Sequence, residues 1–159
     1  MKITIIAVGK IKEKFYRDAI DEYSKRLSKY CKLEIKEVAD EKTPDHASDT
    51  VNVQILTKEG ERIKNLIPKD SHVIVLAIEG RKYDSVEFAD MINNAGIHGI
   101  SNITFIIGGS LGIADEIKKS ANVAISFSDM TFPHQLMRVI LLEQIYRGYK
   151  IITKEPYHK

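Results

Sequence analysis

The chain has 159 residues, of which 43% are hydrophobic and 29% charged, and its formal net charge is +2. This length and composition predict one globular domain with a buried core and exclude a disordered chain. The small net charge excludes a strongly basic nucleic-acid-binding domain, so any affinity for RNA must come from locally placed basic residues.

The N-terminal residues carry one lysine, Lys2, before an apolar run at 3–8. This run is too short and too β-branched for a signal peptide, so we interpret it as the first strand. The single cysteine, Cys31, allows no intrachain disulfide and no cysteine-based metal cluster. We therefore expect a cytoplasmic protein with no membrane segment and no metal.

Short apolar runs alternate with helical patterns along the chain. Four runs lack apolar/polar alternation, which is typical of parallel strands covered on both faces. They span 3–8, 72–78, 103–107 and 123–127. A fifth run, 33–38, does alternate, which predicts a strand with one face in water near a sheet edge.

Apolar residues at three- and four-residue spacing predict helices between these strands. The longer predicted helices are 12–30, 49–66, 86–95 and 134–150. Strictly alternating strands and helices predict an α/β domain with a mostly parallel sheet flanked by helices. Ligands of such sheets bind beyond the carboxyl ends of the strands, here after Ile78, Ile107 and Phe127.

The last predicted helix, 134–150, is apolar on nearly all sides. A helix of this kind must be covered all round, and in a small domain the sheet covers one side. The other side then requires a second subunit, so this helix predicts a homodimer with two-fold symmetry.

Glycines follow the predicted strand 103–107, at Gly108, Gly109 and Gly112. A glycine-rich turn at a strand end is equally typical of a structural turn and of a ligand loop. The spacing matches neither a P-loop nor a dinucleotide fingerprint, and the chain has no metal-ligand spacing and no Gly-x-Ser-x-Gly elbow.

Three other segments are candidates for chemistry. After strand 72–78 we expect a glycine turn that includes Glu79, followed by a helix cap formed by Asp84 with Glu87. Between 127 and 135, Asp129 or Thr131 would cap a turn, and Pro133 would begin the last helix. The C-terminal residues are a loose end by default, but an aromatic, a histidine and lysines also suit RNA.

Four motifs together resemble the bacterial RlmH family of ribosomal RNA large subunit methyltransferases. They are Phe105-Ile-Ile-Gly-Gly-x-x-Gly112, Ser128-x-Met-Thr-x-Pro-His-Gln135, Glu143-Gln-Ile-Tyr-Arg147 and Pro156-Tyr-His-Lys159. The resemblance spans essentially the whole chain, so 1–159 is expected to be a single SPOUT methyltransferase domain. It implies an α/β knot in which the C-terminal segment forms a trefoil, which pattern arguments alone would not propose.

The resemblance implies S-adenosylmethionine as cofactor and assigns roles to residues. The implied cofactor-binding residues are Leu76, Gly108, Phe127, Ser128, Asp129, Met130, Thr131 and Phe132. The implied catalytic residues are His134, Arg147, Tyr157 and His158, and the implied RNA-binding residues are Arg138, Arg147 and Lys159. The cofactor-binding positions fall in the strand-end segments already selected by pattern.

The implied reaction is methylation of N3 of a pseudouridine in 23S ribosomal RNA, on the assembled ribosome. One subunit of the homodimer would hold the cofactor while the partner's tail contacts RNA. His134 or His158 could accept the N3 proton, or a cation could stabilise the anion, and the sequence leaves this open. Two alternatives stand beside this reading: a non-catalytic RNA-binding or ribosome-associated module, and a SPOUT enzyme with another RNA target.

Overall fold

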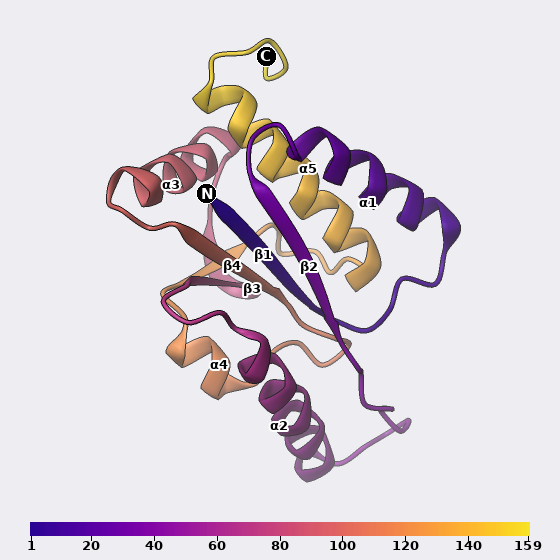
Figure 1. The fold of residues 1–159 in the computed structure, drawn as a ribbon. Helices are drawn as coiled ribbons and strands as arrows, with labels where there is room; N and C mark the ends of the chain where they lie inside the picture. The colour runs from indigo at the N-terminus through magenta and orange to yellow at the C-terminus, as the bar shows by residue number, and fades with distance from the viewer.

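The computed structural model describes residues 1–159 as one α/β domain (Figure 1). Its centre is a five-stranded sheet of order β2-β1-β4-β3-β5 in which every pairing is parallel. The strands are β1 (Lys2–Val8), β2 (Lys32–Val38), β3 (His72–Lys82), β4 (Asn102–Ile107) and β5 (Val123–Ser126). The predicted α/β class is confirmed, and β2, whose sequence alternates, lies at an edge of the sheet as expected.

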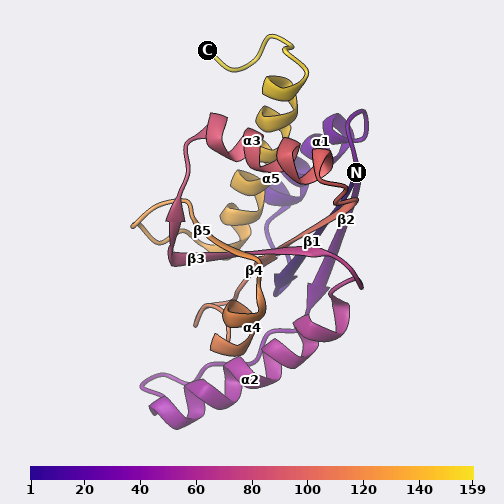
Figure 2. The ribbon, with the colours of Figure 1, turned by 90° about the vertical axis from the view of Figure 1, so that its left-hand side faces the viewer.

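Five helices cover the two faces of this sheet. They are α1 (Lys14–Leu27), α2 (Asp49–Leu66), α3 (Ser85–Ile97), α4 (Asp115–Ser120) and α5 (His134–Ile152). Helix α5 lies between α1 and α3 on one face, and α2 and α4 lie on the other (Figures 1 and 2). None of these helices is both long and apolar enough to cross a lipid bilayer.

The sheet is buried on both faces, which explains why its central strands lack alternation. In β1, Ile3 and Ile5 pack into the core under α1, α3 and α5. Ile6 and the terminal Val8, on the opposite face, pack into a second core under α2 and α4. All four side chains are at most 1% exposed, so polar residues at any of these positions would be costly to bury.

Strand β3 runs further than its apolar sequence predicts. Leu76 and Arg81 both pair with Ile125 of β5, so the four residues between them bend out of the ladder as an extended bulge. The expected glycine turn at Glu79 is therefore a bulge within β3. Gly80 closes this bulge, because a Cβ there would lie 2.7 Å from the backbone of Ala124. The capping box expected of Asp84 and Glu87 is present at α3.

Helix α5 is covered more completely within one chain than its sequence indicates. Leu141, Leu142 and Ile145 are fully buried, and α1 and α3 cover its two flanks. Part of the apolar excess that predicts a dimer is therefore satisfied by these neighbouring helices. Leu136 and Ile140 remain half-buried, and the homodimer stays a prediction, as does the trefoil threading of the C-terminal segment.

Candidate functional site

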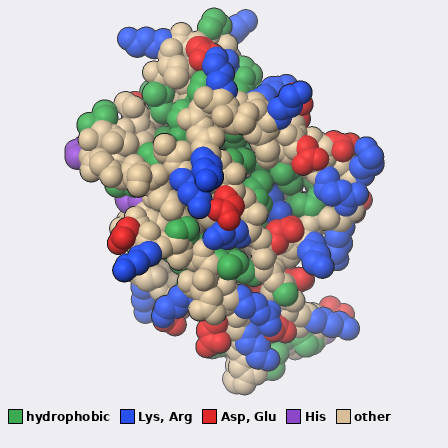
Figure 3. All heavy atoms as spheres, viewed as in Figure 1, with side chains coloured by type: hydrophobic (Ala, Val, Ile, Leu, Met, Phe, Trp, Pro, Cys, Tyr) green, Lys and Arg blue, Asp and Glu red, His purple; other side chains and the backbone are tan.

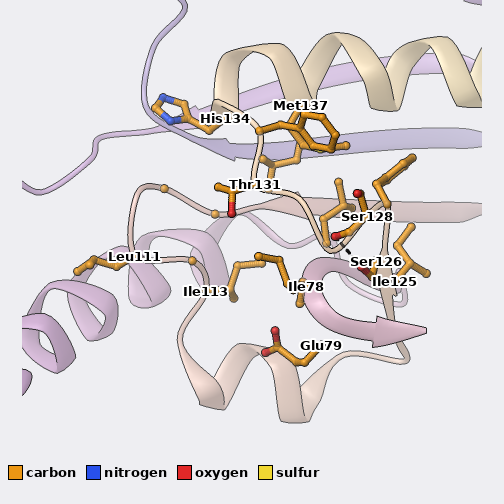
Figure 4. Close-up of a pocket in the computed structure, with 18 of the residues that line it drawn as sticks. Ile78, Glu79, Leu111, Ile113, Ile125, Ser126, Ser128, Thr131, His134 and Met137 are labelled. Carbon is orange, nitrogen blue, oxygen red and sulfur yellow. Dashed lines mark hydrogen bonds between the residues drawn. The ribbon is translucent and has the colours of Figure 1, made fainter. Parts of the chain in front are cut away.

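A pocket of about 430 Å³ opens at the carboxyl ends of β3, β4 and β5 (Figure 4). Its walls are the β3 bulge, the glycine-rich segment after β4, the segment after β5 and the first turn of α5. These are the strand-end segments that the β-α pattern selects as ligand-binding places. The order of elements thus predicts the position of the pocket, and parallel strands bring segments far apart in sequence to one edge.

Most of the residues implied to bind the cofactor lie in the wall of this pocket. They are Leu76, Gly108, Phe127, Ser128, Met130, Thr131 and Phe132, and His134 joins them from α5. Asp129 departs from the expectation, because it is absent from the wall and its exposed carboxylate pairs with Lys82. Ser128, and neither Asp129 nor Thr131, caps the turn by accepting a hydrogen bond from the Met130 N–H at 3.0 Å.

The glycine-rich segment after β4 is a tight loop that Gly109 and Gly112 close with a bridge. A Cβ at Gly108 would overlap the Gly112 carbonyl, and Gly112 adopts a φ of +86°. Both glycines are therefore required by the geometry of the loop itself. A large side chain at Gly108 would break the loop before it filled the pocket.

The pocket contains three ionisable side chains: Glu79, Lys118 and His134. Glu79 Oε1 and Lys118 Nζ are 2.6 Å apart, and this hydrogen bond lowers the pKa of Glu79 and raises that of Lys118. Neither residue stands out as a site residue in the sequence. The pattern predicts a turn at Glu79, and Lys118 carries no local signal because the two residues meet only through the fold.

A second cluster lies at the far end of α5, where the C-terminal segment folds back. Arg147 Nη2 donates to Glu143 Oε1 at 2.8 Å, its Nη1 contacts His158 Nδ1 at 3.3 Å, and its guanidinium lies 4.7 Å from the centre of the Tyr157 ring. The Tyr157 hydroxyl donates to Glu143 at 3.2 Å, and burial raises the pKa of Tyr157. Three residues implied to be catalytic thus meet around Glu143, which sequence reasoning did not single out.

The C-terminal segment is anchored to the domain, so it is not the loose end that position alone predicts. The Glu155 carboxylate accepts hydrogen bonds from Lys150 at 2.8 Å and from Tyr30 of the α1–β2 turn at 2.8 Å. These hydrogen bonds lower the pKa of Glu155 to about 2, and the bond from Lys150 has the largest effect. Lys159, the last residue, is exposed beyond this anchor.

The pocket and the Arg147 cluster are well separated within one chain. Arg147 follows His134 by 13 positions on the same helix, which corresponds to roughly 20 Å along its axis. Figure 1 shows the chain end beyond the end of α5 that is remote from α4. One protomer therefore does not bring its own Tyr157 and His158 to its own pocket.

Arg138, implied to bind RNA, is buried. It is 2% exposed, its Nη1 donates to Glu37 Oε2 at 2.8 Å, and its Nη2 donates to the Gly9 carbonyl at 3.2 Å. This position corrects the expectation of a phosphate contact: Arg138 ties α5 to the ends of β1 and β2. On the face shown in Figure 3, the exposed basic side chains are interspersed with acidic ones.

The fold and the pocket define an α/β protein with a ligand site at the strand ends, and comparison with known proteins gives the class. The family model described as "Predicted SPOUT methyltransferase" matches residues 1–158, so the chain belongs to the SPOUT methyltransferase family. A probable methylase family protein from Haemophilus influenzae shares the fold, with a TM-score of 0.53 and 11% identity over 99% of this chain and 70% of that one.

Curated relatives match over the full length of both chains. The ribosomal RNA large subunit methyltransferase H of Bifidobacterium adolescentis is 65% identical over 159 residues, covering 100% of each chain. A protein of Clostridium perfringens with this name is 56% identical, and a putative one of Methanococcus maripaludis is 60% identical, each with the same complete coverage. The family resemblance carried by the four motifs is confirmed.

Proposed function

We propose that the protein transfers a methyl group from S-adenosylmethionine to N3 of a pseudouridine in 23S ribosomal RNA. The observation that carries this proposal is the pocket built from the β3, β4 and β5 strand ends in a chain with full-length ribosomal RNA methyltransferase relatives. Such a substrate is found on cytoplasmic ribosomes, where we expect the protein to act.

The residues present fit S-adenosylmethionine. The pocket volume lies within the range of small-molecule sites, and most such sites combine apolar walls with a few polar groups. Leu76, Ile113 and Phe127 offer apolar surface for a flat ring, while Ser128 and Glu79 offer polar groups. When bound, S-adenosylmethionine supplies a methyl group activated by its positively charged sulfur.

A homodimer would complete the site. The Arg147 cluster lies roughly 20 Å along α5 from His134, so the tail of a second copy must approach the pocket for both to act on one nucleotide. The half-buried outer residues of α5, such as Leu136 and Ile140, are available for that contact. The charge and the aromatic ring of Arg147 and Tyr157 suit an RNA phosphate and base.

The N3 proton must leave during the reaction, and the surroundings of His134 and His158 support different roles for the two histidines. A guanidinium can only donate, so the 3.3 Å contact between Arg147 Nη1 and His158 Nδ1 is a hydrogen bond in the tautomer that carries its hydrogen on Nε2. His158 is therefore disposed to donate to an anionic base oxygen. His134 lies in the wall of the pocket, which supports it as the proton acceptor.

Mixed dimers test the composite site. His134→Ala and Arg147→Ala each remove one half, and we expect neither variant alone to methylate ribosomes. In mixed dimers one site combines the two intact halves, so re-equilibrated equal mixtures should recover about a quarter of wild-type activity. No recovery from mixtures shown to contain mixed dimers would contradict a shared site.

Calorimetry with S-adenosylmethionine tests the cofactor directly. Submicromolar to micromolar binding by the folded protein is the expected result, together with methylation of pseudouridine-containing ribosomes. RNA binding without any S-adenosylmethionine binding would instead favour a non-catalytic RNA-binding module. Methylation confined to transfer RNA would favour a SPOUT enzyme with another target.

A further inference from the structure

The ionisable groups of the pocket lie at opposite sides of it. Figure 4 shows Glu79 on the β3 bulge and His134 at the start of α5, with Thr131 between them. Lys118 comes from α4 and closes the wall on the side of Glu79. One side of an otherwise neutral pocket is therefore an ion pair, and the other side carries a histidine.

The ion pair holds the Glu79 carboxylate in place without using all of its hydrogen-bonding capacity. Lys118 Nζ bonds Oε1 at 2.6 Å, and Asp115 Oδ1 lies 3.4 Å from the same ammonium. The other oxygen of Glu79, Oε2, retains free lone pairs, because an ionised carboxylate has about four acceptor positions. The Glu79 side chain is 62% exposed, so a ligand can reach it.

We propose that Glu79, oriented by Lys118, is the specificity residue that binds the ribose hydroxyls of S-adenosylmethionine; this rests on the proposed function. The methionine half of the cofactor is zwitterionic: Glu79 would attract its ammonium but repel its carboxylate, and Lys118, whose own ammonium already contacts Glu79 and Asp115, would repel the cofactor's ammonium. Neutral hydroxyls face neither penalty, and vicinal hydroxyls can donate to one carboxylate in charge-assisted hydrogen bonds.

This assignment also gives the ligand a direction in the pocket. Ribose held at the Glu79 side leaves the His134 side for the half of the cofactor that bears the methyl group. His134 lies in that part of the wall and is the group proposed to accept the substrate proton. The two ends of the pocket thus have separate tasks, recognition at Glu79 and chemistry at His134.

Calorimetric titration of two ligands tests the assignment. S-adenosylmethionine carries both ribose and amino acid, whereas 5′-methylthioadenosine carries the ribose but lacks the amino acid. We expect Glu79→Ala to weaken both by about tenfold or more, the effect of losing charge-assisted hydrogen bonds. Asp115→Ala is the matched control, because Asp115 also contacts Lys118 but is 84% exposed and lies outside the pocket wall.

The outcomes separate this inference from the proposed function. Weaker binding of S-adenosylmethionine alone would place Glu79 at the amino-acid end and overturn the ribose assignment. Unchanged binding of both ligands by Glu79→Ala would overturn the role of Glu79. The proposal that the pocket binds S-adenosylmethionine would still stand. Binding of neither ligand by the wild-type protein would overturn the proposed function as well. Thermal unfolding of each variant verifies that it is folded.

Discussion

Glu143 and Arg147, one turn apart on α5, form an ion pair in which the Arg147 Nε and Nη2 atoms lie 3.1 and 2.8 Å from Glu143 Oε1. The hydroxyl of Tyr157 donates to the same carboxylate oxygen. Glu143 therefore fixes the guanidinium and the aromatic ring relative to each other. This arrangement gives the short C-terminal segment a defined surface, which we propose contacts RNA.

Replacing Glu143 with alanine should release Arg147 and Tyr157 from their fixed positions without changing the pocket. We expect methyl transfer to ribosomes to fall at least tenfold, because Arg147 and Tyr157 lose their common acceptor, while S-adenosylmethionine binding stays unchanged. Glu22→Ala is the control, since Glu22 forms a comparable ion pair with Arg26 on α1. Equal activity losses in both variants would argue against a specific role for Glu143.

Arg138→Met should act on stability. Its removal leaves the Gly9 carbonyl and the Glu37 carboxylate without their donor, and we expect a loss of about 2 kcal/mol in the free energy of unfolding. Urea unfolding measures this, with Arg26→Met as an exposed control. The slope of log RNA affinity against log salt should stay the same, whereas a reduction by one phosphate would restore Arg138 as an RNA contact.

The fold was accessible from the sequence because its signals are local. Continuous apolar runs such as Ile3–Val8 indicate strands buried on both faces. The alternation of these runs with helices predicts a parallel sheet that binds ligands at its strand ends. The pocket could therefore be placed without a structure. The residue roles inside it depended on the family resemblance.

The parts that sequence reasoning missed depend on long-range contacts. Arg138 looks like a surface residue on a helix, and only the approach of the β1 and β2 ends shows that it is buried. Glu79 and Lys118 are 39 positions apart and meet because the β3 bulge bends toward α4. No periodicity or spacing rule reports a contact of this kind.

Gly80→Ala tests the bulge that carries Glu79. The new methyl group would lie 2.7 Å from the backbone of Ala124 and Ile125, which cannot move without disturbing β5. We expect a loss of roughly 1–3 kcal/mol in stability and weaker S-adenosylmethionine binding. Gly96→Ala in α3 is the control: a Cβ there would lie at an ordinary 3.7 Å from Met1 Cε, so stability should be equal or higher. Unchanged cofactor binding in Gly80→Ala would show that the conformation of the bulge does not affect cofactor binding.

Glu59 of α2 should make stability depend on pH. The residue is 5% exposed, its carboxylate accepts one hydrogen bond from the Glu41 N–H at 2.9 Å and lies near Asp40, and Arg62 pairs with Glu41. Burial, the largest cause, raises the pKa of Glu59 in the folded state. The folded protein thus binds this proton more readily than the unfolded chain, so ionised Glu59 destabilises the fold at neutral pH.

Glu59→Gln should therefore be more stable than the wild type at pH 7.5, by on the order of 1 kcal/mol, because a neutral amide can still accept from Glu41. The sign follows from linkage: as pH falls through the raised folded pKa toward the unfolded value near 4.5, the wild type gains its proton and the advantage shrinks. Urea unfolding between pH 7.5 and pH 4 measures the difference, with the exposed neighbour changed in Glu61→Gln as control. An advantage that stayed constant over this range would show that the charge of Glu59 is not its cause.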